Sequence, residues 1–237
     1  MTGIVLELAD DALIAAQRLS QWCARAPQLE EDVALANITL DLLGQARALL
    51  SHAGDLEGAG RGETELAFLR EPEEFRNAQL VELPDDDFAT AIAKLLFFAV
   101  FQSLRYTALR DADDPVLAAI AGKAAVETRY HVEHAHAWTV RLGDGTPESK
   151  RRMQAAVDDV WPFTHGLFEP GAPGFDPESL RAAWTGRVES VLREATLERP
   201  ADGWTPTGGR RGEHTEAFSY LVQEMQGLHR AHPGARW

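Results

Sequence analysis

Glu127, His131 and His134 are the residues whose types and spacing best suit metal chemistry. They lie four and three residues apart, which puts all three on one face if the segment is helical. Helical bundles hold di-iron centres with inward-facing groups, where two helices each supply a Glu and two others each supply a Glu-x-x-His motif. Glu127 and His131 are one residue further apart than that motif requires. Because they still share a face, spacing alone leaves metal binding open.

The number of donors argues against a complete metal site. Asp41 is followed three residues later by Gly44, where a histidine would be needed, and Glu213 is followed three residues later by Glu216. We therefore expect no metal in this chain, and instead a residual polar cluster that is internally paired, because an unpartnered buried carboxylate is costly. The candidate members of this cluster are Asp41, Glu127, His131, Glu213 and His214. A working di-metal site and ordinary solvent-facing charges are the alternatives that the pattern leaves open.

Motifs for other catalytic mechanisms are absent from the sequence. It has no Gly-x-Ser-x-Gly nucleophile motif, no phosphate-binding loop and no Gly-x-Gly-x-x-Gly fingerprint. The stretch from Gly208 to Gly212 is rich in glycine, carries Arg210 and Arg211, and precedes a predicted helix. It suits the binding of an anion at a helix N-terminus as well as it suits a flexible entry loop.

The composition indicates a folded protein that does not bind nucleic acid. Its 237 residues are 45% hydrophobic, with 23 Lys and Arg against 37 Asp and Glu, a net charge of −14. Affinity for nucleic acid comes mainly from cations that neutralise phosphates. A single cysteine, Cys23, excludes an internal disulfide. Residues 1–12 do not resemble a signal peptide, and the most apolar run, 95–101, is far shorter than a bilayer span. We therefore expect a cytoplasmic protein without a membrane span.

Helices must position the candidate residues, because apolar residues recur at spacings of three and four along nearly the whole chain. We predict an all-α fold, one bundle-like domain over residues 1–237 with about seven or eight helices. The predicted helices cover residues 6–24, 28–52, 63–70, 85–110 and 115–142, and three more begin near residues 147, 177 and 213. Three of these starts carry an Asp-Pro or Thr-Pro pair, in which a capping side chain precedes a proline in the first turn.

In two of these helices, the face that packs on the core decides where the candidate residues lie. The helix over 28–52 carries one apolar stripe, as a face that packs on a core does: Leu29, Val33, Ala36, Leu40, Leu43 and Leu50. On the helix over 115–142, two lines compete for burial, and spacing does not choose between them. One contains Ile120, Ala124, Glu127, His131, His134 and Trp138, and the other Leu117, Ala121, Thr128, Val132, Ala135 and Leu142.

Several separated strings resemble one known family. They are the run 35–47 with Asp41-Leu42-Leu43-Gly44-Gln45 within it, Arg129-Tyr130-His131, Thr207-Gly208-Gly209, His214-Thr215-Glu216, Gln21-Trp22-Cys23 and the terminal Trp237. Their order and their spread over essentially the whole chain resemble the C subunit of bacterial phenylacetyl-CoA 1,2-epoxidases.

The resemblance implies a ferritin-like helical bundle and a part in aerobic phenylacetate catabolism. In that family's complex, a ferritin-like A subunit holds a di-iron centre, and a reductase with flavin and iron–sulfur groups delivers electrons from NADPH. One oxygen atom of O₂ is added across the aromatic ring of phenylacetyl-CoA to give the ring 1,2-epoxide. The C subunit has lost the metal ligands and pairs with the A subunit to hold it in its working form. We thus expect no catalytic residue and no cofactor in this chain.

The resemblance also implies that the acyl-CoA lies near the contact between the A and C subunits, with loops of the latter at its nucleotide end. The matching segment here is Glu74, Phe75, Arg76 and Asn77, in which Phe75 and Asn77 match the family and Arg76 departs from it. A cation suits a polyanionic ligand such as CoA. Residues 171–173 are a second candidate, in a stretch that is shortened here.

Two other functions remain open from the sequence. One is an independent di-metal oxidase or oxygenase that uses the residues of the polar cluster, which near-stoichiometric iron in the purified protein would support. The other is a helical binding module without an oxygenase partner, which the failure to find a ferritin-like partner would support.

Overall fold

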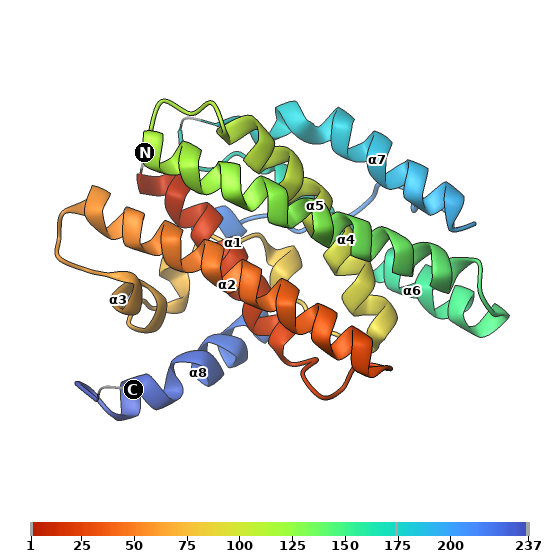
Figure 1. Ribbon diagram of the computed structural model, residues 1–237, viewed down its shortest axis with the longest axis horizontal. Coiled ribbons are helices and arrows are strands. Elements are labelled where there is room, and N and C mark those ends of the chain that lie inside the picture. The colour runs from red at the N-terminus through yellow and green to blue at the C-terminus, as the bar shows by residue number, and fades with distance from the viewer. Residues whose placement is uncertain (1, 174, 236–237) are drawn as a thin grey trace. The chain divides into compact units, whose positions relative to one another are not determined.

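The computed structural model describes residues 2–173 and 175–235, so Trp237 lies outside the described residues (Figure 1). Over these residues the chain is all-α, as predicted, with no strand. The α-helices are α1 (Thr2–Ser20), α2 (Leu29–Glu57), α3 (Glu63–Phe68), α4 (Phe88–Leu109), α5 (Pro115–Gly143), α6 (Pro147–Thr164), α7 (Arg181–Glu194) and α8 (Glu216–Ala231). Short 3₁₀ helices are η1 (Pro72–Glu74), η2 (Gln79–Glu82), η3 (His165–Phe168), η4 (Pro177–Leu180) and η5 (Gly209–Arg211).

Capping side chains begin the helices where the sequence predicts them. Asp87, just before α4, accepts a hydrogen bond from the Thr90 N–H at 3.0 Å. Asp114, just before α5, accepts the Val116 and Leu117 N–H groups at 2.9 and 3.1 Å. Such caps satisfy N–H groups that have no partner inside the first helical turn. These starts are therefore decided locally, by a few adjacent residues.

Several predicted helix bounds differ from the structure by a few residues. The first helix, predicted over 6–24, spans Thr2–Ser20, and the second, predicted over 28–52, continues to Glu57. The Asp176-Pro177 pair opens η4 rather than a long helix, and α7 begins only at Arg181. The predicted start near residue 213 shifts to Glu216, because Gly212 adopts a left-handed conformation (φ 84°) that ends η5.

The chain divides into two compact units, each built on a pair of long helices. Unit 1 comprises Met1–Pro84, Gly171–Phe175 and Gly208–Trp237, and unit 2 comprises Asp85–Pro170 and Asp176–Thr207. Unit 1 contains the α1–α2 hairpin with α3 and α8, and unit 2 the α4–α5 hairpin with α6 and α7. Long antiparallel hairpins of this kind are the elements of a ferritin-like helical bundle. Whether residues 1–237 act as one domain stays a prediction.

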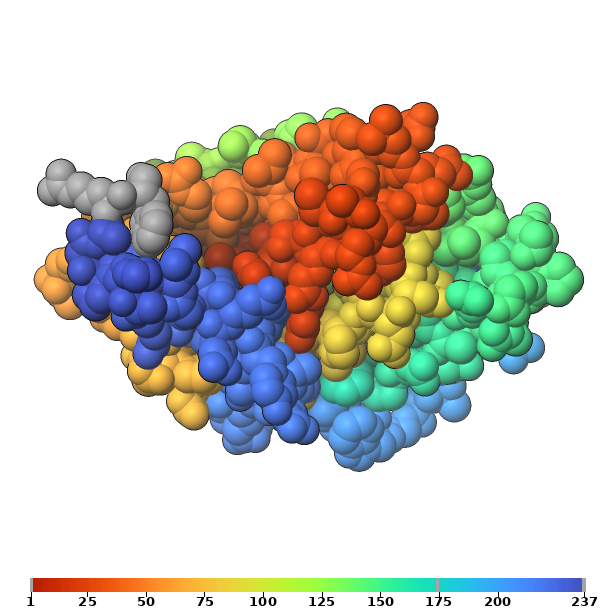
Figure 2. Space-filling model, turned by 90° about the horizontal axis from the view of Figure 1, so that it is seen from below, coloured from red at the N-terminus to blue at the C-terminus, as the bar shows by residue number. Residues whose placement is uncertain are grey.

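The stripe predicted to pack α2 on the core does not do so. Leu29, Val33 and Leu40 are 75%, 55% and 63% exposed, and of that stripe only Leu50 is buried. The buried face of α2 carries Leu35, Ile38, Leu42, Ala46 and Leu49. Both stripes have helical spacing, so periodicity could not tell which one faces α1. In Figure 2, α1 and α2, in red to orange, lie beside α3 and the blue α8 within unit 1.

Unit 2 packs around α4, whose predicted apolar run 95–101 is buried. Trp184 of α7 lies among aromatic rings, with centroids 5.9 Å from Phe97, 5.8 Å from Trp161 and 5.3 Å from Phe168. Its indole Nε1–H donates to the Phe97 carbonyl at 2.9 Å. Tilted and edge-to-face rings of this size supply much of the burial in a core.

The buried face of α5 runs between the two lines that the sequence left open. It takes Ala124, His131 and Trp138 from one line, and from the other it takes Leu117, Ala121, Thr128 and Ala135. These positions alternate spacings of three and four residues, as in the seam of a coiled coil. His131 is therefore fully buried, whereas Glu127 keeps 17% of its side chain exposed.

Two helices, α2 and α4, are long and apolar enough to cross a membrane by length and composition alone. The relevant stretch of α4 is 78% buried, as in the core helix of a soluble protein, and that of α2 is 39% buried. This is weak support for a span, so the absence of one stays a prediction, as does the cytoplasmic location.

Candidate functional site

Two consecutive buried acids of α1 lock the segment that follows α3. Asp10 pairs with the guanidinium of Arg70, both side chains being at most 2% exposed, and it accepts the Arg76 backbone N–H at 2.8 Å. Asp11 accepts the Ala78 backbone N–H at 2.8 Å. A buried carboxylate is tolerated when cations and N–H groups compensate it. The acids thus fix the register of residues 76–78 against α1.

The segment alternates between side chains that anchor it and side chains that face outward. Phe75 is fully buried, packs edge-on against Phe218 with centroids 5.5 Å apart, and has the Arg70 guanidinium 4.1 Å from its ring centroid. Its backbone is extended (φ −77°, ψ 151°), so neighbouring side chains point to opposite sides. Asn77 is also fully buried, whereas Arg76 is half-buried and lines a pocket.

Glu82, at the end of η2, ties this segment to the start of α8. Its Oε1 accepts the Asn77 amide at 2.8 Å and lies 2.5 Å from His214 Nδ1. Its Oε2 accepts both the backbone N–H and the hydroxyl of Thr215 at 2.8 Å. Thr215 is the residue just before α8, so a fully buried carboxylate sits at the positive end of that helix. His214 also stacks on Phe218 at 4.0 Å.

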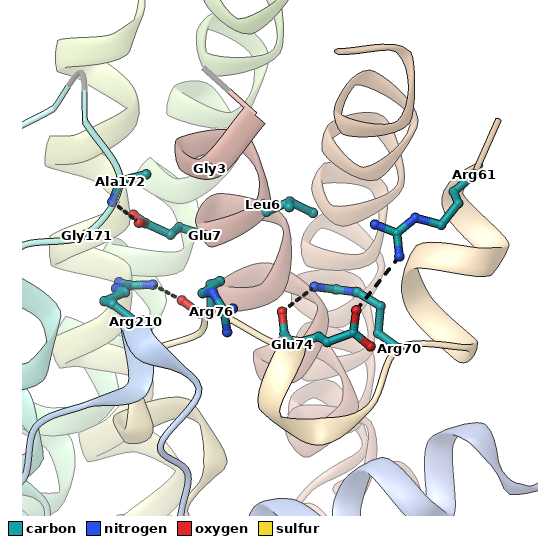
Figure 3. Close-up of a pocket in the computed structure, with 10 residues that line it drawn as sticks. All are labelled: Gly3, Leu6, Glu7, Arg61, Arg70, Glu74, Arg76, Gly171, Ala172 and Arg210. Carbon is teal, nitrogen blue, oxygen red and sulfur yellow. Dashed lines mark hydrogen bonds and ion pairs between the residues drawn. The ribbon is translucent and has the colours of Figure 1, made fainter. Parts of the chain in front are cut away.

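A pocket of about 450 Å³ lies over this anchored segment (Figure 3). Cations dominate its polar lining, since four arginines face two carboxylates there. The lining residues are Gly3, Leu6, Glu7, Arg61, Arg70, Glu74, Arg76, Gly171, Ala172 and Arg210. Arginine clusters suit phosphate and carboxylate groups, which they bind through charge-assisted hydrogen bonds. The chemistry of the pocket is therefore that of an anion site.

Most arginines of the pocket are already committed to acids of this chain. Arg61 pairs with Glu57, whose hydrogen bond raises the pKa of Arg61, and Arg70 pairs with Asp10. Arg210 pairs with Asp11 at 2.8 Å and also donates to the Arg76 carbonyl.

Arg76 differs from the other arginines of the pocket. Its Nη1 donates to the carbonyls of Glu73 and Phe75 at 2.7 and 2.8 Å, and no carboxylate of the described residues pairs with its side chain. Arg76 is thus the pocket cation best placed to meet an external anion.

The loop at 171–172 closes one side of the pocket against α1. The Ala172 N–H donates to the Glu7 carboxylate, as Figure 3 shows. A Cβ on Gly171 would lie 2.2 Å from the same carboxylate, so a larger residue there would displace the Glu7 side chain from this position. Of the predicted CoA contacts, the pocket thus brings together Glu74 and Arg76 with Gly171 and Ala172, while Phe75 and Asn77 act as anchors. The contact with CoA itself stays a prediction.

The sequence reasoning missed most of the residues that build the site. Arg61, Arg70, Asp10 and Asp11 were not singled out, although consecutive acids in the middle of an apolar helix are unusual and signal buried partners. Arg210 was noted only within a glycine-rich basic stretch, and Glu82 had no local signal.

Comparison with known proteins agrees with the strings identified in the sequence. The family model described as "Phenylacetic acid catabolic protein", which bears the names of an A and a C protein, matches residues 1–237. The chain belongs to this family. A relative from Escherichia coli (strain K12), named as the C subunit of 1,2-phenylacetyl-CoA epoxidase, is 44% identical over 246 residues, which cover 100% of this chain and 99% of the relative. The predicted resemblance is confirmed.

In this chain, the predicted polar cluster is distributed over both units. Asp41 and His214 belong to unit 1, as does Glu213, whose side chain is 66% exposed and lies 3.6 Å from Arg211. Glu127 and His131 belong to unit 2, and Glu127 lies 3.3 Å from Lys123. The cluster as a whole therefore stays a prediction.

Two further observations concern metal donors. No group of three or more His, Cys, Asp or Glu side chains among the described residues is arranged to hold a metal ion. A Glu-x-x-His spacing that the sequence reasoning missed occurs at Glu133 and His136, but His136 Nε2 lies 2.9 Å from Glu194 near the surface.

Proposed function

We propose that this chain is the C subunit of a phenylacetyl-CoA 1,2-epoxidase complex and that it works there without an active site of its own. The full-length match, at 44% identity, to a relative that bears this name carries the proposal. The word subunit in that name supports a complex of several chains. In the proposed complex, which is cytoplasmic, the A subunit holds the di-iron centre and a reductase with flavin and iron–sulfur groups supplies electrons from NADPH.

The positions of the donor residues support a structural role. Glu213 faces solvent, and Gly44 and Glu216 occupy the positions where histidines would complete two Glu-x-x-His-like pairs. A chain with such a donor set would support the A subunit by contact rather than by chemistry. The reaction supported in this way is the addition of one oxygen atom of O₂ across the ring of phenylacetyl-CoA.

We further propose that the arginine-lined pocket receives the phosphate end of phenylacetyl-CoA. CoA carries several phosphate charges, and Arg76 presents a guanidinium that no carboxylate of the described residues pairs with. The pocket volume of about 450 Å³ accommodates part of the nucleotide, not the whole acyl-CoA. The acyl end would then extend toward the A subunit.

Coexpression with the A subunit and the reductase tests the structural role. We expect NADPH-dependent conversion of phenylacetyl-CoA to require both this chain and the A subunit. We also expect the conversion to persist when this chain carries Glu127→Gln combined with His131→Gln. Since His131 is fully buried, complex formation by the variant must be checked by size-exclusion chromatography. Loss of turnover in a fully assembled variant complex would instead assign chemistry to these side chains.

The competing proposal, an independent di-metal oxidase, predicts a different metal content. Protein purified alone from iron-rich medium would then contain nearly two iron ions per chain. We expect well below one iron ion per chain. The iron content is measured by inductively coupled plasma emission spectroscopy, in a sample that circular dichroism shows to be folded.

A further inference from the structure

Trp204 is the one tryptophan of the described residues whose ring lies largely in solvent. It belongs to the loop between α7 and η5, and it is 73% exposed. Its ring meets the half-buried ring of Phe163, at the end of α6, edge-on with centroids 6.1 Å apart. The two rings form a small aromatic surface within unit 2. Aromatic side chains that combine a large contact area with an open face are enriched at protein interfaces.

The other described tryptophans have their rings covered by groups of this chain. Trp184 is enclosed by aromatic rings. Three others each have an arginine guanidinium near the ring centroid: Arg25 at 5.6 Å from Trp22, Arg141 at 4.7 Å from Trp138 and Arg199 at 4.9 Å from Trp161. Among the described residues, the ring of Trp204 contacts only Phe163. Its faces are therefore open to a cation that this chain does not supply.

The loop that displays Trp204 is clamped to α6. The Gln154 side chain of α6 accepts the Glu198 backbone N–H at 2.8 Å and donates to the Glu198 carbonyl at 3.0 Å. Asp202 accepts the Trp161 Nε1–H at 3.1 Å. Both contacts lie in the same loop, shortly before Trp204. A side chain whose backbone is already held in place loses less entropy when a partner covers it, so Trp204 is suited to anchor a contact.

The surroundings of Trp204 are acidic. Asp159 is exposed and lies one helical turn before Phe163, so the two side chains share a face of α6. Asp202 keeps 52% of its side chain exposed. Residues 157–164 and 195–207 together carry four acids and a single arginine: Asp158, Asp159, Glu198, Asp202 and Arg199. That arginine is paired with both Asp202 and Glu189. The surface therefore attracts a cation and repels a phosphate or a carboxylate.

We propose that Trp204, Phe163, Asp159 and Asp202 form a docking site for an arginine side chain of another subunit of the epoxidase complex. This inference rests on the proposed function, which supplies the neighbouring subunit. The guanidinium would lie over the Trp204 ring, because a planar cation is attracted to the negative face of an aromatic ring. Its N–H groups would donate to one of the two carboxylates.

This chain contains the same arrangement internally, next to the proposed site. Arg199 lies over the Trp161 ring and at the same time pairs with Asp202 at 2.8 Å. The proposed contact would repeat that combination of ring, guanidinium and carboxylate across a subunit boundary.

A second copy of this chain and a nucleotide fit the site less well than an arginine. Two copies that met at Trp204 across a twofold axis would bring the same acids face to face. A nucleotide base could stack on Trp204, but its phosphates would then lie close to the acids of residues 157–164 and 195–207.

Photocrosslinking tests what covers Trp204 in the complex. Trp204→p-benzoylphenylalanine places a photoreactive aromatic side chain at this position. The full-length variant is coexpressed with the other subunits of the epoxidase, and the purified complex is irradiated. We expect crosslinks, mapped by mass spectrometry, to another subunit next to an arginine. The absence of a crosslink in an assembled complex, or crosslinks only to segments without arginine, would overturn the inference.

Substitutions then test whether the ring contributes to the affinity. The dissociation constant between this full-length chain and the crosslinked subunit is measured for each variant. We expect Trp204→Ala to weaken binding by at least ~10-fold, and Trp204→Phe, which keeps a ring, to weaken it by less than ~3-fold. Tyr220→Ala is the control, because Tyr220 is a 66% exposed aromatic residue on α8, and it should change binding by less than ~2-fold.

The arginine found by crosslinking provides the partner's side of the test. Its replacement by glutamine should weaken binding to the wild-type chain and should weaken binding to Trp204→Ala no further, because both changes remove the same contact. Circular dichroism checks that each variant of this chain is folded. Equal binding by wild type and Trp204→Ala would overturn the inference.

The outcomes separate the docking site from the proposed function. If the complex assembles and converts phenylacetyl-CoA while position 204 crosslinks to nothing, the docking site is wrong and the proposed function stands. If the wild-type chain assembles with no subunit of the epoxidase, both are overturned. Crosslinks between two copies of this chain would overturn the inference in favour of a contact between copies.

Discussion

Glu82 Oε1 lies 2.5 Å from His214 Nδ1, and this contact joins η2 to the start of α8 inside unit 1. His214 Nε2 lies 3.2 Å from the Phe75 carbonyl, so one imidazole bridges a buried carboxylate and the segment beneath the pocket. The same carboxylate also accepts hydrogen bonds from Asn77 and Thr215. The start of α8 is therefore held by polar contacts as well as by the packing of Phe218. The shape of the pocket floor therefore depends on a residue that does not line it.

Replacing Glu82 should destabilise the protein strongly. In Glu82→Gln the new amide N–H₂ is a donor and would face groups that themselves donate hydrogen bonds to the wild-type carboxylate. The negative charge beside His214 would also be lost. We expect the free energy of unfolding to fall by about 3 kcal/mol, measured by urea denaturation. Glu213→Gln is the control, because its side chain is 66% exposed, and it should change stability by less than about 0.5 kcal/mol. Equal stability of the two variants would contradict the role of Glu82.

Arg76→Gln should weaken the binding of CoA without weakening the fold. Its Nη1 donates only to carbonyl groups, at 2.7 and 2.8 Å, so its removal leaves no buried carboxylate unpaired. We expect a loss of affinity for CoA of about 10-fold, by calorimetry on the assembled complex, since a charge-assisted hydrogen bond would be lost. Arg211→Gln changes the net charge equally at a residue outside the pocket lining. Equal losses in both variants would mean that only overall charge attracts the ligand.

Trp184→Phe should destabilise unit 2 through the loss of one buried hydrogen bond. The indole N–H of Trp184 donates to the Phe97 carbonyl at 2.9 Å within an aromatic core. We expect a loss of about 1–2 kcal/mol by thermal or urea denaturation, and about 4 kcal/mol for Trp184→Ala, which also leaves a cavity. Trp204→Phe is the matched control, because Trp204 is 73% exposed. A comparable loss in the control would show that the effect does not come from the core contact.

Glu148 should titrate well below an ordinary glutamate. Hydrogen bonds from Arg151 and then Arg152 lower its pKa from 4.5 to about 2. A carboxyl whose pKa is lower in the folded state stabilises the fold at pH above 4.5, and this contribution is lost as the pH falls through about 2. We expect a midpoint near 2 for the Glu148 carboxyl carbon by NMR. The same midpoint in Arg151→Gln with Arg152→Gln would contradict this cause.

The sequence by itself determined the helices and the family. Caps such as Asp114-Pro115 and Thr146-Pro147 act through N–H groups two or three residues away, so the starts of α5 and α6 are decided by adjacent residues. The strings that identify the family are likewise short and contiguous. Residues 74–77 and 171–173 could be proposed as contacts of CoA only through the resemblance that these strings carry.

Only the tertiary structure decided which faces and partners these helices use. Two apolar stripes of α2 have the same period, and the presence of α1 on one side is what buries Leu35 and Ile38 and leaves Val33 and Leu40 in solvent. An ion pair beside the pocket joins Asp11 to Arg210, which are 199 residues apart. A buried charge requires a counter-charge close to it in the folded protein. The residues next to it in the sequence do not specify which residue will supply that counter-charge, because only the fold brings the two together.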